Sequence, residues 1–140
     1  MAEDKVFLDT NIIIYAYDAT AGEKHRTARD ILVDLWNSGR GLLSAQVLQE
    51  FFVTVTRKIP NPIEPELAGD IIDGFLKWDV VSITGESVPD AIGIHLQYKY
   101  SFWDSMIIEA SIRGGATLLL TEDFSDGQKI GDLRIKNPFK

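Results

Sequence analysis

Apolar residues follow two different spacings along this chain. Short continuous runs, typical of buried strands, occur at residues 5–8, 42–43, 79–84 and 117–121, with a brief final run near residues 134–135. Longer segments with apolar positions every three or four residues predict helices at 9–18, 23–38, 44–58, 66–77, 86–100 and 102–113. Because strands that alternate with helices form βαβ units, this order predicts an α/β fold with a mostly parallel sheet.

Size and composition fit one globular domain spanning residues 1–140. No apolar run approaches the roughly 18 residues that a membrane span needs. The acidic start, with Glu3 and Asp4, is unlike the basic region of a signal peptide. We therefore expect a cytoplasmic protein without membrane contact. The absence of cysteine excludes disulfides, thiol catalysis and cysteine-ligated zinc.

The net charge of the chain is weak evidence about its partners. The formal charge is −7, from 21 acidic and 14 basic residues. Taken alone, this disfavours nucleic-acid binding, because contacts to phosphate need cations. Divalent ions held by clustered acids would make their site far less negative and would themselves attract phosphate. The charge balance therefore does not exclude a nucleic-acid substrate.

Four acids occupy positions from which they can meet. Asp9 and Asp123 each follow a predicted strand, whereas Glu50 and Asp104 lie on predicted helices. Ligands of open α/β sheets bind beyond the carboxyl ends of the strands, so we expect the four carboxylates at one edge of the sheet. A carboxylate cluster with no resident Lys or Arg needs a cation, and its hard oxygen ligands favour Mg²⁺ or Mn²⁺.

Each acid also has a local structural interpretation. Asp9 is a good helix N-cap, and Glu50 flanks an apolar helical stripe as a solvated charge would. Asp104 completes a variant capping box, Ser-x-x-Asp, while Asp123 lies in a turn with Asp126 as a reserve acid. No single acid is persuasive. Their joint placement favours a metal site, because clustered carboxylates without a cation repel and some become protonated.

At these residues the chain resembles PIN-domain proteins, and specifically the VapC-type toxin ribonucleases of toxin–antitoxin systems. The first resembling motif is Leu-Asp-Thr-Asn-Ile at residues 8–12, and Glu50 follows the second predicted strand as the family's glutamate does. Further motifs are Phe-Trp-Asp-Ser-Met-Ile-Ile-Glu-Ala at 102–110, Leu-Leu-Thr-Glu-Asp-Phe at 119–124 and Ile-Lys-Asn-Pro-Phe at 135–139. The resemblance covers essentially the whole chain, in order.

The resemblance implies a fold, a site and an activity. The fold is a PIN-like three-layer α/β/α domain with a short, mostly parallel sheet of about four to five strands flanked by helices. The implied catalytic and metal-binding acids are Asp9, Glu50, Asp104 and Asp123; Asp9 and Asp104 are central, and Thr121, Asn11 and Asp126 are candidates for supporting roles. One or two Mg²⁺ or Mn²⁺ ions would activate a water that hydrolyses RNA phosphodiester bonds.

Family resemblance also implies partners. These are an RNA substrate, with tRNA as one candidate, a cognate antitoxin protein and a second copy of the chain in a homodimer. Candidate RNA contacts are Lys24, Arg26, Arg57 and Lys58, although each also fits an ordinary solvated charge. Arg57 returns to the helix face of Glu50 and is an alternative partner for that carboxylate. In the aromatic stretch Tyr98, Tyr100, Phe102 and Trp103, core packing explains the residues better than base stacking does.

Three other classes of protein place acids in an α/β fold. A haloacid-dehalogenase-like phosphatase expects a second acid two residues after the strand-end aspartate, and this chain has Asn11 there. A response-regulator receiver domain expects adjacent acids and fits the helix count poorly. A non-catalytic PIN-like module that binds RNA or protein would be favoured by loss of some acids. All four are present, so the sequence favours catalysis.

Overall fold

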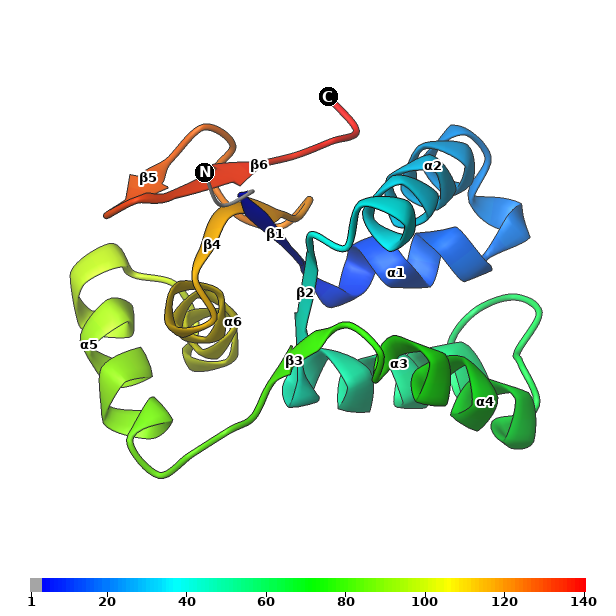
Figure 1. Ribbon diagram of the computed structural model, residues 1–140, viewed down its shortest axis with the longest axis horizontal. Helices are drawn as coiled ribbons and strands as arrows, with labels where there is room; N and C mark the ends of the chain where they lie inside the picture. The colour runs from blue at the N-terminus through cyan, green and yellow to red at the C-terminus, as the bar shows by residue number, and fades with distance from the viewer. Residues whose placement is uncertain (1–3) are drawn as a thin grey trace.

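The computed structural model describes residues 4–140 and arranges them around one six-stranded sheet (Figure 1). Residues 1–3, part of the acidic start that speaks against a signal peptide, lie outside the described residues. The strands are β1 (Lys5–Leu8), β2 (Gly41–Ser44), β3 (Asp79–Val81), β4 (Ala116–Leu120), β5 (Lys129–Ile130) and β6 (Leu133–Lys136). The helices are α1 (Thr10–Tyr17), the 3₁₀ helix η1 (Ala19–Ala21), α2 (Glu23–Ser38), α3 (Ala45–Arg57), α4 (Pro65–Phe75), α5 (Ser87–Tyr98) and α6 (Phe102–Arg113).

The sheet has the order β3-β2-β1-β4-β6-β5, and all pairs are parallel except β5 with β6. The expectation of a mostly parallel α/β sheet is therefore confirmed. The sheet has one strand more than the expected upper limit, because the two-residue strand β5 pairs with β6 as an antiparallel hairpin. The strand expected over 79–84 ends at Val81, and the helix expected over 86–100 covers Ser87–Tyr98.

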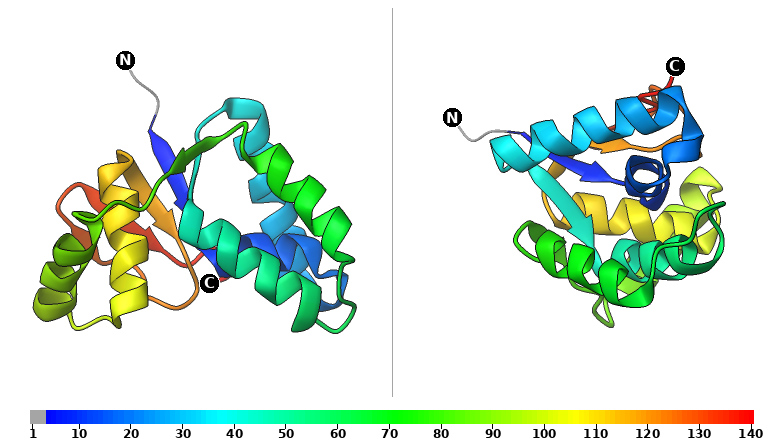
Figure 2. Two further views of the ribbon diagram at one scale, coloured as in Figure 1. Left: turned by 90° about the horizontal axis from the view of Figure 1, so that it is seen from below. Right: turned by 90° about the vertical axis from the view of Figure 1, so that its right-hand side faces the viewer.

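Helices cover both faces of the sheet. The pair α5 and α6 packs on one side, and α1 to α4 lie on the other, which gives three layers (Figure 2). The central strands are buried on both faces, as expected for parallel strands, and their fully buried side chains include Phe7, Leu8, Leu42, Leu43 and Leu119. None of the helices within residues 4–140 is long and apolar enough to cross a membrane.

The topology brings the ends of β1 and β4 together. The two strands are parallel neighbours with Leu8 opposite Leu120, and the Asp9 amide donates a hydrogen bond to the Leu120 carbonyl at 3.0 Å. Asp9 and Thr121 therefore leave the sheet side by side. Strand β2 lies on the other side of β1 and ends at Ser44, whose hydroxyl caps α3 by accepting from the Val47 amide at 3.3 Å. These three strand ends position the segments that carry the predicted site residues.

Candidate active site

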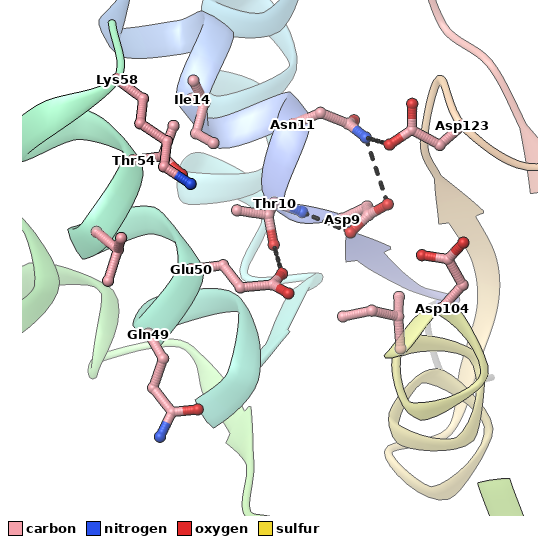
Figure 3. Close-up of a pocket in the computed structure, with 12 residues that line it drawn as sticks. Asp9, Thr10, Asn11, Ile14, Gln49, Glu50, Thr54, Lys58, Asp104 and Asp123 are labelled. Atoms are coloured by element: carbon pink, nitrogen blue, oxygen red, sulfur yellow. Dashed lines mark hydrogen bonds between the residues drawn. The ribbon is translucent and has the colours of Figure 1, made fainter. Parts of the chain in front are cut away.

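A cavity of about 540 Å³ lies beyond these strand ends, and all four predicted acids line it (Figure 3). Its wall is formed by α1, α3, the start of α6 and the segment after β4. The lining residues are Asp9, Thr10, Asn11, Ile14, Gln49, Glu50, Val53, Thr54, Lys58, Asp104, Ile107 and Asp123. The structure thus brings together at one edge of the sheet the acids that the sequence separates by up to 114 positions.

Asp9 is the most deeply buried of these acids. Its carboxylate is the N-cap of α1, accepting from the Thr10 amide at 2.7 Å, and its second oxygen accepts from the Thr121 hydroxyl at 2.8 Å. The residue is 6% exposed. Burial raises the Asp9 pKa to about 7, helped by the nearby Glu50 and Asp123 charges and opposed by the hydrogen bonds from Thr121 and Thr10. The Asp9 side chain therefore caps α1 and also lines the cavity.

Asn11 connects two of the acids. Its side-chain amide nitrogen lies 2.9 Å from Asp123 Oδ2 and 3.3 Å from Asp9 Oδ2, and donates to both. Thr121 accepts from the Asp123 backbone amide at 3.1 Å, so the same hydroxyl orders both carboxyl-bearing segments. Asn11 Oδ1 is buried without a hydrogen-bond partner within residues 4–140. Among the carboxylates there is thus one amide oxygen that accepts no hydrogen bond and is available as a metal ligand.

Two residues outside the predicted set hold the Glu50 side chain. The Thr10 hydroxyl donates to Glu50 Oε1 at 2.5 Å, and Gln46 Nε2 lies 3.3 Å from Glu50 Oε2. Gln46, four residues earlier on α3, also donates to the Trp103 carbonyl at 3.2 Å. Side chains three or four residues apart on a helix are neighbours, which is the one signal that connects Gln46 with Glu50 in the sequence.

Asp104 occupies the first turn of α6, across the cavity from Glu50 (Figure 3). Its amide donates to the Ser101 hydroxyl at 3.1 Å, which confirms that Ser101 caps this helix. Partial burial raises the Asp104 pKa, and the charges of Asp123 and Glu50 act in the same direction. Raised pKa values at Asp9 and Asp104 have the same physical cause: carboxylates removed from water and left near other carboxylates.

The premise that this cluster has no resident base needs correction, because Lys58 also lines the cavity. In Figure 3 its side chain extends from the end of α3 on the side opposite Asp104. Within residues 4–140 it forms no ion pair with any of the four acids. One lysine at the wall does not neutralise four carboxylates, so the cluster still favours a bound cation.

The donor set fits Mg²⁺ or Mn²⁺ held partly through water. Across the described part of the chain, no group of three or more acidic or histidine side chains is close enough together to hold an ion by direct ligation alone. Mg²⁺ usually keeps several waters and takes one or two protein carboxylates, so wider spacing is compatible with it. The buried, unpartnered Asn11 oxygen adds a hard donor at the same place.

Other predicted site residues lie elsewhere or are already engaged. Asp126 does not line the cavity; its Oδ1 accepts from the Asn137 amide at 2.8 Å and so fixes the C-terminal segment. Lys24 forms an ion pair with Glu122 at 2.8 Å, and Arg26 pairs with Glu23. Arg57 is exposed and forms no ion pair with Glu50 within residues 4–140. Of the four basic candidates, only Lys58 lines the cavity.

The aromatic stretch before Asp104 divides into two parts. Tyr98 and Tyr100 pack against the hydrophobic core, as expected, and Phe102 is half-buried. Trp103 is 64% exposed, so the interpretation of this residue as a core side chain is wrong. Trp103 is exposed because it stands on the first turn of α6, before the buried stretch of that helix begins. A large aromatic residue type does not predict this exposure.

The fold and this acid-lined cavity define an α/β protein with its site at the carboxyl edge of a parallel sheet. Residues 6–125 match the PIN domain, and the chain therefore belongs to the PIN-domain family. The expected family resemblance is confirmed. No curated protein matches the chain in sequence.

Solved structures share this fold at low sequence identity. A toxin–antitoxin complex from Klebsiella pneumoniae has a chain 17% identical, with a TM-score of 0.70, covering 97% of this chain and 99% of that one. DNA-bound VapBC from Salmonella typhimurium gives 19% identity, a TM-score of 0.67 and the same coverages of 97% and 99%. VapC20 from Mycobacterium tuberculosis, a toxin that cleaves the sarcin–ricin loop, gives 19% identity and 0.63, covering 82% and 87%. At these identities the likeness shows the fold.

Proposed function

We propose that this protein is a Mg²⁺- or Mn²⁺-dependent endoribonuclease and the toxin component of a VapBC-type toxin–antitoxin pair. The observation that carries the proposal is the convergence of Asp9, Glu50, Asp104 and Asp123 on one cavity. Membership of the PIN-domain family and the fold shared with solved toxins support it. The whole chain, residues 1–140, then acts as a single nuclease domain in the cytoplasm.

The acids divide the work according to their surroundings. Asp9 and Asp104 are the central ligands, because Asp9 is buried, Asp104 is partly buried, and both have raised pKa values that a cation would lower. Glu50 and Asp123 complete the shell directly or through water. When bound, one or two divalent ions supply an activated water and stabilise charge on the scissile phosphate. No histidine, serine or cysteine nucleophile is needed.

Polar neighbours keep these carboxylates in place. Thr10 orients Glu50, Thr121 orients Asp9, and Asn11 joins Asp9 with Asp123. Both oxygens of Asp9 and of Glu50 accept hydrogen bonds, but a carboxylate has about four acceptor sites, so each still has capacity for a further ligand. Lys58 is the proposed contact for an RNA phosphate from the cavity wall. Lys24, Arg26 and Arg57 remain proposed contacts outside it, with Lys24 and Arg26 first having to leave their glutamate partners.

A homodimer and a cognate antitoxin are part of the same proposal. Exposed apolar side chains on α2, α3 and α4 offer surface for such partners, among them Val33, Trp36, Phe52, Val53 and Leu67. Relatives in fold were solved as toxin–antitoxin complexes, which supports an antitoxin here. The alternative is a non-catalytic PIN-like module. A phosphatase of the haloacid-dehalogenase type is disfavoured because Asn11 is an amide donor where that mechanism needs an acid.

The test is cleavage of a structured RNA pool that includes tRNA, with Mg²⁺ or Mn²⁺ and with EDTA. Asp104→Asn removes a central carboxylate, whereas Asp126→Asn changes an acid outside the cavity and keeps an oxygen for the Asn137 amide. We expect metal-dependent cutting by the wild-type protein and by Asp126→Asn, and none by Asp104→Asn. Cutting that survives Asp104→Asn, or folded protein that binds metal and cuts no RNA, would overturn the nuclease proposal.

A further inference from the structure

Trp103 is the most exposed of the exposed large hydrophobic residues in the described part of the chain, at 64%. Burying apolar surface is favourable, so a large exposed aromatic side chain beside a functional site is a candidate contact surface for the molecule that binds there. Trp36, at 45%, differs in kind, because it packs against Phe75 and Trp78 in an aromatic cluster. Within residues 4–140, the one aromatic neighbour of Trp103 is Phe102, with ring centroids 5.1 Å apart and planes at 76°.

The position of Trp103 ties it to the acid-lined cavity. It directly precedes Asp104, whose side chain lines that cavity. Its carbonyl accepts from Gln46 Nε2 at 3.2 Å, and the same nitrogen lies 3.3 Å from Glu50 Oε2. A single side chain thus joins the backbone of Trp103 to one of the proposed ligands. The backbone of Trp103 is therefore anchored to α3, directly before the acid that α6 contributes to the cavity.

Charge makes an aromatic contact valuable at this site. The cavity has four carboxylates and one lysine along its wall, and the chain has a formal charge of −7. Attraction of phosphates by side chains is correspondingly weak here, because that term depends on Lys and Arg. Stacking of a base on an aromatic ring does not depend on charge and is tolerant of sequence, since every base has a π-face. An unpaired base is needed, because bases within a duplex are already stacked.

We infer that Trp103 is a stacking platform for one unpaired base of the RNA next to the bond that is cleaved. This inference rests on the proposed nuclease function and adds to it one substrate-contacting residue outside the carboxylate cluster. Trp103 binds and positions the substrate, and the carboxylates carry the chemistry. Gln46 contributes indirectly by holding the Trp103 backbone against α3.

The test measures RNA binding separately from cleavage. Fluorescence anisotropy with labelled 12-nucleotide single-stranded RNAs and a duplex of equal length is measured with Mg²⁺ on protein carrying Asp104→Asn, so that the probes stay intact. Three further variants are compared in this background. Trp103→Phe keeps an aromatic face, Trp103→Leu keeps only apolar surface, and Leu96→Ala truncates a side chain of similar exposure on α5.

We expect single strands to bind more tightly than the duplex. Trp103→Leu should weaken single-strand binding by about 10- to 100-fold, whereas Trp103→Phe and Leu96→Ala should change it less than about threefold. Three results would overturn the inference: single-strand binding by Trp103→Leu that equals binding without that substitution, a loss of binding in Trp103→Phe as large as in Trp103→Leu, or no binding of single strands at all. A second copy of the chain is the alternative occupant of the Trp103 surface, and light scattering of each variant tests for it. If Trp103→Leu dissociates a dimer without weakening RNA binding, the residue contacts a second copy and the inference is overturned.

Failure of the inference and failure of the nuclease proposal give different results. If Trp103-dependent binding is seen while wild-type protein with metal cuts no RNA, the proposed enzyme fails and the base contact stands. If wild-type protein cuts RNA in a metal-dependent way, and Trp103→Leu binds and cuts RNA as well as protein that keeps Trp103, the nuclease stands and the base contact fails. Circular dichroism of Trp103→Leu confirms that it is folded, and Trp103→Phe provides the conservative replacement.

Discussion

The side-chain amide of Asn11 donates a hydrogen bond to Asp123 Oδ2 at 2.9 Å. The two residues follow different strands of the sheet, β1 and β4, and lie 112 positions apart in the chain. Asn11 also reaches Asp9 Oδ2 at 3.3 Å, so one amide separates two carboxylates that would otherwise face each other. A neutral donor between like charges lowers their repulsion without adding a competing cation.

Replacing Asn11 tests this arrangement. Asn11→Ala should lower the free energy of unfolding by about 1 kcal/mol in EDTA, because the carboxylates lose their shared donor. Asn11→Asp should be worse in EDTA and should recover with Mg²⁺, since it adds a further carboxylate that a cation can neutralise. Urea denaturation with and without Mg²⁺ measures both effects. Asn37→Ala, on the exposed surface of α2, is the control. Equal stability of Asn11→Ala and wild type would show that the amide bridge does not matter.

Burial of Asp9 predicts an unusual dependence of stability on pH. Its pKa is about 7 in the folded protein against 3.8 for an exposed aspartate, so the folded state holds a proton that the unfolded state has lost. This contribution is fully present below pH 3.8 and disappears as pH rises through 7. Metal-free protein should therefore lose stability over that window, by up to about 4 kcal/mol from this group alone. The raised Asp104 pKa acts in the same direction.

Thermal unfolding in EDTA at pH 5 and pH 7.5 measures this loss, with Asp9→Asn as the comparison. Asn is also a good N-cap, so the variant keeps the start of α1 while removing the ionisation. We expect a smaller change between the two pH values in Asp9→Asn than in wild type, and we expect Mg²⁺ to restore wild-type stability at pH 7.5. A wild-type protein that becomes more stable between pH 5 and pH 7.5 in EDTA, relative to Asp9→Asn, would contradict the assignment.

The sequence predicted the parts of this molecule that depend on repeating patterns. Strands β1 and β4 are continuous apolar runs, and a strand that is buried on both faces has no other pattern to show. The positions of Asp9 and Thr121 at the strand ends were predictable, because each residue comes directly after one of these runs. Strand β5, in contrast, has two residues and forms because it pairs with β6, so no local periodicity predicts it.

Polar contacts across the site could not be predicted in the same way. Thr10 follows Asp9 and resembles another capping residue, yet its hydroxyl reaches Glu50, 40 positions away. Gln46 reaches Trp103 across 57 positions. These pairs depend on how α1, α3 and α6 meet, which the spacing of apolar residues does not encode. Exposure of Trp103 has the same origin, because the residue type sets its hydrophobicity and the packing of α6 sets its surroundings.

A buried ion pair within α6 should matter for stability. Glu109 is 5% exposed, and its two oxygens accept from Arg113 Nε at 2.7 Å and Nη2 at 3.1 Å. Arg113 also donates to Ser87 Oγ at 2.9 Å, which joins α6 to α5. Arg113→Leu leaves a buried carboxylate without its partner and should cost about 2–3 kcal/mol, below the usual range because the arginine is one-third exposed.

The double variant Glu109→Leu with Arg113→Leu separates the two contributions. It removes both charges, and we expect it to be more stable than Arg113→Leu alone, because no uncompensated carboxylate remains. Arg29→Leu, at an exposed position of α2, controls for loss of a positive charge in an acidic protein. Urea denaturation gives the free energies. A single variant Arg113→Leu as stable as Arg29→Leu would show that the Glu109 carboxylate finds water or becomes protonated at little cost.

Lys99 ends α5 in a backbone conformation that favours glycine. Its φ is 67° and its ψ is 21°, and it is the only non-glycine residue within residues 4–140 with a positive φ. The left-handed conformation costs a side-chain-bearing residue roughly 1–2 kcal/mol, and glycine gives back part of this through its greater freedom when unfolded. Lys99→Gly should therefore stabilise the protein by about 0.5–1 kcal/mol. Gln97→Gly, two residues earlier and within the helix, should destabilise it by about 1 kcal/mol. Urea denaturation of the two variants at one pH compares the same new residue in two conformations, so a loss of stability in both would mean that the Lys99 side chain contributes more than its backbone costs.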